Sequence, residues 1–93
     1  MTYRFLSTAQ RDLADAIAFY EAAVPGLGLD FVDEVERTIH RILLQPEAWK
    51  RVSAHHRRCH TRRFPYGLIY SVEGDEILIS AVFHLRRLPN SWK

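Results

Sequence analysis

The segment HRRCHTRRFPYGLIY, residues 56–70, gathers the side chains best suited to binding or acting on an anion. It holds four arginines, two histidines and a cysteine directly before a short apolar run. Arginine pairs with phosphate or carboxylate through two parallel hydrogen bonds, and histidine exchanges protons near neutral pH. Cleavage of RNA through its 2′-hydroxyl needs such groups, because it requires a base, an acid and a cation beside the phosphorane.

A strand over Arg57–Phe64 would point alternate side chains to opposite faces of a sheet. Arg58, His60 and Arg62 then lie on one face, and Cys59 lies on the other. Cysteine is small and apolar enough to face the helices, so we expect the three basic residues to line a surface that the helices leave free.

A second basic group follows the last predicted strand. His84 ends that strand, and Arg86 and Arg87 come directly after it. If the protein cleaves RNA, histidines would transfer protons and arginines would stabilise the phosphorane. The candidate catalytic residues are then Arg58, His60, His84 and Arg87. The alternative is a solvated basic strand at a sheet edge, whose charges prevent aggregation.

Other site chemistry has little support in the sequence. His55, His56 and His60 do not have the spacing of a known zinc site, and there is no glycine-rich phosphate loop. We therefore expect no metal and no cofactor. Cys59 is the single cysteine, which excludes an internal disulfide and favours a reducing compartment.

Length and composition predict one small domain over residues 1–93. The apolar share of 47% is that of a globular chain. Residues 1–46 hold four Lys or Arg against seven Asp or Glu, whereas residues 47–93 hold nine against four. The second half is therefore poised to meet an anionic partner. With no apolar leader and no run long enough to span a bilayer, we expect a cytoplasmic protein.

Two amphipathic helices are predicted in the first half. The first follows Ser7, which stands three residues before Gln10 as in a capping box, and ends at Pro25-Gly26. The second runs from about residues 28–30 to Pro46. Apolar residues recur at helical spacing in both, at Leu13, Ile17, Tyr20 and Val24 in the first and at Phe31, Val35, Ile39 and Ile42 in the second.

Strands are predicted at Tyr3–Leu6, Arg57–Phe64, Leu68–Val72 and Ile77–His84, with a loop over residues 47–56 anchored by Trp49. Strict alternation in the last strand would point Ile77, Ile79, Ala81 and Phe83 to one face. The predicted fold is α+β, with the order β-α-α-β-β-β and a helical hairpin packed on one face of a small, mainly antiparallel sheet. The opposite face is left for a macromolecule.

Three stretches together resemble the RelE/ParE toxins, the plasmid stabilisation proteins of type II toxin–antitoxin systems. They are DLADAIAFYEAAVPGLGLDFVDEVE, RFPYGLIY and ISAVFHLRRLPNSW, and the resemblance runs from about Ala9 to Trp92. It implies the fold described above and a bacterial toxin neutralised by a cognate antitoxin. The basic half suits an acidic antitoxin tail.

The superfamily divides by target. RelE-like members cut messenger RNA in the ribosome, and ParE-like members act on DNA gyrase. Gly67 stands where many of the nucleases carry an arginine, and glycine cannot stabilise a phosphorane; the resemblance is therefore closer to the ParE-like branch. It implies that the target or the antitoxin binds at Arg58, Arg62, Arg63, Arg86, Arg87 and Trp92. A third alternative is a non-toxic relative that still binds antitoxin.

Overall fold

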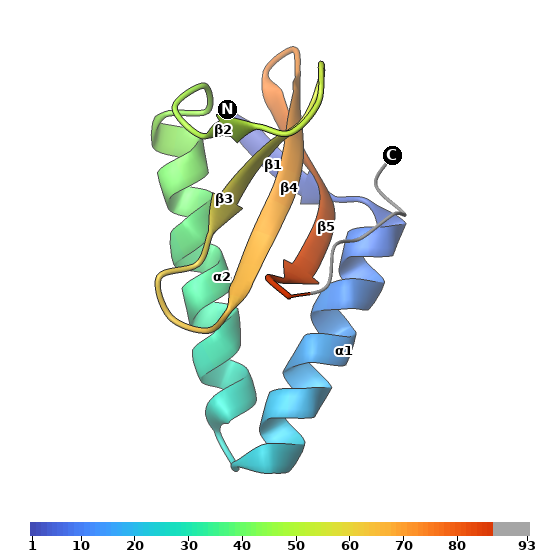
Figure 1. The fold of residues 1–93 in the computed structure, drawn as a ribbon, viewed down its shortest axis with the longest axis vertical. Helices are drawn as coiled ribbons and strands as arrows, with labels where there is room; N and C mark the ends of the chain where they lie inside the picture. Colours follow the sequence, from blue (N-terminus) through green and yellow to red (C-terminus); the bar gives the residue numbers. More distant parts are fainter. Residues whose placement is uncertain (87–93) are drawn as a thin grey trace.

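The fold consists of a helical hairpin packed on a five-stranded sheet, as seen in a computed structural model that describes residues 1–86 (Figure 1). The sheet has the strand order β1-β5-β4-β3-β2; β1 pairs with β5 in parallel, and the other pairs are antiparallel. The predicted α+β fold class is confirmed. The elements in chain order are β1 (Thr2–Phe5), α1 (Ser7–Ala23), α2 (Leu27–Leu44), β2 (Lys50–Arg51), β3 (Arg57–His60), β4 (Tyr66–Glu73) and β5 (Glu76–His84).

The turn between the helices lies at Pro25-Gly26, as predicted. Gly26 has a φ of 88°, in the left-handed region where glycine is favoured. The carboxylate of Glu21 accepts hydrogen bonds from the backbone N–H groups of Gly26 and Gly28, at 2.9 and 3.0 Å. A carboxylate from α1 thus accepts hydrogen bonds from backbone N–H groups at the start of α2, which have no acceptor within the helix.

Two details of α1 differ from the prediction. Ser7 is the first helical residue; the cap is Leu6, without a side-chain hydrogen bond, so the capping box is not formed. Leu6 accepts the first helical bond from Gln10, which lets β1 run almost directly into the helix. Val24 is exposed because the helix ends before it, whereas Leu13, Ile17 and Tyr20 pack against the core as predicted.

The core lies between the helices and one face of the sheet. All four predicted stripe residues of α2 are buried there, together with small residues of α1 such as Ala9 and Ala16. The sheet contributes Leu68, Tyr70, Ile77 and Ile79, and the Tyr70 hydroxyl donates a 2.6 Å hydrogen bond to the carbonyl of Pro46. Neither helix of residues 1–86 is long and apolar enough to cross a membrane.

A β-bulge in β5 overturns the predicted alternation of that strand. Tyr70 pairs with Ile79 and Ile69 pairs with Ala81, so Ser80 is an extra residue in the ladder. Val82 therefore joins Ile77 and Ile79 on the helix side, while Ala81 and Phe83 point to the other face. The pattern of apolar letters does not reveal this shift, because both faces of β5 are apolar here.

Side chains of α1 satisfy the backbone beside the bulge. Thr8 Oγ1 donates to the carbonyl of Ser80 at 3.0 Å, and Asp12 Oδ2 accepts from the N–H of Val82 at 3.1 Å. β1 ends at Phe5, which pairs with Ile79. Within residues 1–86, the residues of β5 beyond Ile79 therefore have no neighbouring strand on the edge where β1 lies. Burial of the Asp12 carboxyl raises its pKa, against the lowering effect of the Val82 hydrogen bond.

The second half of the chain also departs from the expected bounds. The predicted strand over Arg57–Phe64 ends at His60, and the two-residue strand β2 lies within the predicted loop. The chain turns at Thr61. The N–H of Thr61 donates a hydrogen bond to the carbonyl of Tyr66, and its hydroxyl donates one to the carbonyl of Phe64 at 2.7 Å. Phe64 adopts a φ of 71°, uncommon for a residue other than glycine.

Candidate functional site

The outer face of the sheet, which points away from the helices, carries two of the predicted basic residues. Arg58 pairs with Ile69 in the β3–β4 ladder, and His60 pairs with Gly67. Side chains of paired residues share a face, and Ile69 belongs to the outer face with Ala81 and Phe83. The predicted placement of Arg58 and His60 on the face opposite the helices is therefore confirmed.

The centre of that face is apolar and not basic. Ile69, Ala81 and Phe83 are buried there, with Val52 packed against them. A Cβ atom on Gly67 would lie 2.9 Å from Phe83 Cζ and 3.1 Å from His60 Cδ2. Glycine is present at residue 67 because the rings of His60 and Phe83 fill the space above it, and an arginine there would displace both.

A basic hollow of 270 Å³ lies along β2 and β3, lined by Trp49, Lys50, Arg58, Cys59 and His60. Lys50 and Arg58 face each other directly across the β2–β3 ladder, as do Arg51 and Arg57. Like charges in such positions repel, and the side chains of Lys50 and Arg58 make no hydrogen bond or ion pair within residues 1–86. The hollow is therefore suited to an anion.

The electrostatics of the hollow favour a neutral histidine and a neutral thiol. Partial burial and the charge of Arg58 lower the pKa of His60. Cys59 is buried on the helix side, as predicted, and burial raises the pKa of its thiol more than Arg41 and Arg62 lower it. Trp49 packs on the core as the predicted anchor, and its buried Nε1 has no partner within residues 1–86.

His84 does not join His60. It pairs with Tyr66 at the end of the β4–β5 ladder, and their ring centroids are 5.3 Å apart in an edge-on contact. Tyr66 packs on Tyr20 and Phe31 from the helices, so His84 lies on the helix side of the sheet. The two histidines thus project from opposite faces and cannot act as acid and base on one phosphodiester across this sheet.

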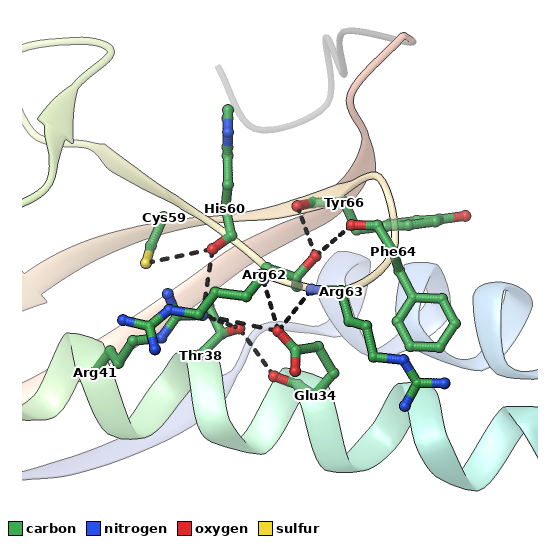
Figure 2. Close-up of polar contacts among 10 residues, drawn as sticks. Glu34, Thr38, Arg41, Cys59, His60, Arg62, Arg63, Phe64 and Tyr66 are labelled. Atoms are coloured by element: carbon green, nitrogen blue, oxygen red, sulfur yellow. Dashed lines mark hydrogen bonds and ion pairs between the residues drawn. The ribbon is translucent and has the colours of Figure 1, made fainter.

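The predicted place of Arg62 on the outer face is wrong, because β3 ends before it. The backbone N–H groups of Arg62 and Arg63 donate to Oε2 of the buried Glu34, at 2.6 and 3.1 Å (Figure 2). Figure 2 shows the ring of His60 pointing away from α2, whereas the side chain of Arg62 lies beside Arg41. The carboxylate of Glu34 pulls the loop towards α2 and away from the outer face.

The loop and α2 enclose a second depression, here called the α2 groove. It has a volume of 660 Å³ and is lined by Glu34, Glu36, Arg37, His40, Arg41, Arg62 and Arg63. The sequence predictions missed the α2 side of this groove and also missed Lys50 in the hollow. Spacing at i, i+3 and i+4 in Arg37, His40 and Arg41 was the available signal, since it places the three on one flank of a helix.

The remaining candidates lie at the end of the chain. Arg86 is exposed after β5, and its N–H donates to Nδ1 of His84 at 3.2 Å. Arg87 and Trp92 lie outside the described residues. Tyr66 and Tyr70 are buried in the core. The site residues that the structure brings together are therefore Arg58 and His60, with Lys50 added, and separately Arg62 and Arg63 with the flank of α2.

Comparison with known proteins agrees with this architecture. Residues 3–89 match the family model described as the ParE toxin of the type II toxin–antitoxin system parDE. A solved structure titled "Chromosomal ParDE TA system from P. aeruginosa" superposes with a TM-score of 0.79 at 19% identity, covering 91% of this chain and 96% of that one. No curated protein matches the chain. Since the family model covers nearly all of the sequence, the chain belongs to the ParE toxin family of type II toxin–antitoxin systems.

Proposed function

We propose that this chain inhibits growth by binding DNA gyrase in the cytoplasm and that a cognate antitoxin neutralises it. Membership of the ParE family supports the antitoxin partnership. The observation that carries the choice of gyrase is the packing of His60 and Phe83 against Gly67, which opposes an arginine at residue 67, the place where many of the nucleases carry one. His84 lies on the opposite face, so it cannot act together with His60 in acid–base catalysis there.

A supercoiling assay with purified gyrase and relaxed plasmid tests this proposal. We expect the purified chain to inhibit supercoiling, and the antitoxin encoded beside it to restore activity at equimolar amounts. A heat-unfolded sample of the same chain is the control. Undiminished supercoiling at a large molar excess of folded chain would rule out gyrase as the target.

The competing function is ribosome-dependent cleavage of messenger RNA. It is favoured by one observation, the grouping of Lys50, Arg58 and His60 around a single hollow. Toeprinting on a translated message separates the two functions, and we expect no cuts in the ribosomal A site. If cuts occur, their loss in Arg58→Ala/His60→Ala and in His84→Ala/Arg87→Ala variants would identify which group supports the chemistry.

A non-toxic relative that only binds antitoxin is distinguished by growth. Induced expression without antitoxin should stop growth and induce the DNA-damage response while protein synthesis continues. Normal growth at full expression would favour the non-toxic alternative, and an immediate loss of translation would favour the nuclease.

A further inference from the structure

The α2 groove has walls that are fixed before any partner binds. One wall is the flank of α2 with Arg37, His40 and Arg41, and the other is the loop with Arg62 and Arg63. The walls are joined by buried Glu34, which is 5% exposed and accepts both loop N–H groups. A ligand therefore meets a preformed shape and does not have to order the loop.

Arg41 sits at the base of the groove and is held from several sides. Its Nη2 donates to Thr38 Oγ1 at 3.0 Å and to the carbonyl of His60 at 3.4 Å, and lies 3.9 Å from Glu34 Oε2. The negative charge of Glu34 is thus already compensated by Arg41 and by two backbone donors. It does not neutralise the arginines nearer the rim.

The rim carries cations that the described residues leave unsatisfied. Arg37 and Arg62 have no hydrogen bond or ion pair from their side chains within residues 1–86. Arg63 makes a 3.5 Å ion pair with Asp30, both being well exposed, so that pair is weak, and its guanidinium also lies 5.1 Å from the centroid of the Phe64 ring. Four guanidinium groups face two carboxylates in the lining, which leaves the groove positively charged.

We propose that the α2 groove binds an acidic peptide segment of a protein partner, with Arg37 and Arg62 as its main carboxylate contacts. Guanidinium groups form two parallel hydrogen bonds to a carboxylate, and their alkyl stems offer apolar surface to a peptide. The inference does not depend on the toxin's target. Only the assignment of the segment to the antitoxin rests on the proposed function.

The mixed charge of the groove favours a peptide over nucleic acid. Glu36 lies in the lining with no ion pair within residues 1–86, and Asp30 lies beside Arg63. A phosphate backbone carries a charge at every nucleotide and would bring some of these charges against the carboxylates. A peptide can space its acidic residues and present its own N–H groups to Glu36.

Fluorescence anisotropy with the full chain tests the proposal. The probe is a short labelled peptide of alternating glutamate and alanine, and its glutamine counterpart is the neutral control. We expect Arg37→Ala/Arg62→Ala to weaken peptide binding by about tenfold or more, since two charge-assisted contacts are lost. Arg4→Ala/Arg11→Ala removes the same net charge from exposed residues elsewhere and should weaken binding less than about threefold.

The other results each overturn the proposal. No binding of the acidic peptide by the wild-type chain would refute it, as would equal losses in the two double variants. Tighter binding of a single-stranded DNA of equal charge, lost in Arg37→Ala/Arg62→Ala, would make the groove a nucleic-acid site. Thermal unfolding of each variant verifies its fold. Inhibition of gyrase is measured in a separate assay, so a negative result for peptide binding can be distinguished from a negative result for the gyrase target.

Discussion

The two faces of the sheet are built on different principles. The helix side is a continuous core in which Tyr20, Phe31, Phe64 and Tyr66 touch one another, with ring centroids 4.8–6.0 Å apart. The outer face has three buried apolar side chains, and Arg58 and His60 lie beside them. Most of the buried apolar packing thus lies on the helix side, and the outer face adds a smaller apolar cluster.

The comparison also shows how each face is kept in register. On the helix side, buried polar contacts from Glu34 and Tyr70 fasten the loops to the core. On the outer face, the side chains of His60 and Phe83 are held by close packing against Gly67. Substitutions should therefore cost most where a buried polar contact is broken and less where only packing is disturbed.

Glu34→Ala should lower stability most, and it tests whether breaking a buried polar contact on the helix side costs more than disturbing the packing of the outer face. It leaves two backbone donors and Arg41 without their charged acceptor, so the free energy of unfolding should fall by about 3 kcal/mol. Urea denaturation measures it. The exposed neighbour Glu36→Ala is the control and should change stability by less than about 0.5 kcal/mol. Similar values for both variants would refute the role of Glu34.

Tyr70→Phe should cost about 1–2 kcal/mol, because the buried carbonyl of Pro46 loses its donor. Burial raises the pKa of Tyr70 to about 12. The folded state therefore keeps the phenol proton that the unfolded chain releases near pH 10, and this stabilisation is lost as pH rises from 10 to 12. Urea denaturation at pH 8 and 11 should show the difference between the two proteins shrinking. Exposed Tyr3→Phe is the control for loss of a hydroxyl and should cost less than about 0.5 kcal/mol at pH 8.

Gly67→Ala tests the outer face and should cost about 1 kcal/mol. The new methyl group meets the ring of Phe83, which must shift. In a Phe83→Leu background the same substitution should cost much less, because the ring is gone. An unchanged cost in that background, measured by thermal unfolding, would mean that the packing of Phe83 is not the constraint.

Asp12→Asn should have the smallest effect, below about 1 kcal/mol at neutral pH, because an amide oxygen can still accept from Val82. The raised pKa of Asp12 means that the folded state holds this proton more tightly. Relative to the Asn variant, the wild type should lose stability as pH rises through the ordinary aspartate range to the raised pKa. Urea denaturation of the wild type and the Asn variant at several pH values measures this trend.

Prediction from the sequence succeeded where a single period governs an element. The stripe of α2 and the Pro25-Gly26 turn follow from helical spacing and turn chemistry, and both are confirmed. The bulge at Ser80 was not predictable from the sequence. It moves the following residues of β5 to the opposite face, and both faces are apolar there, so the pattern of apolar residues looks the same with or without it. It is recognised only once Thr8 and Asp12 are seen to satisfy the freed backbone groups.

The site followed the same rule. Alternation placed Arg58 and His60 correctly because β3 is regular as far as His60. It failed at Arg62, where a carboxylate 28 residues earlier in the chain captures the backbone and turns it towards the helix. Nothing local distinguishes Glu34 from the other acidic residues of α2, because its partner is remote in sequence.

The facing cations of β2 and β3 have a consequence for how the chain behaves on its own. Lys50 opposes Arg58 and Arg51 opposes Arg57 at the last ladder of the sheet, so two copies meeting edge to edge would bring like charges together. Self-association through this border is therefore disfavoured in dilute buffer and becomes easier as salt screens the repulsion. The same facing cations that oppose pairing between two copies also repel each other within one copy, so they lower the stability of the β2–β3 pair.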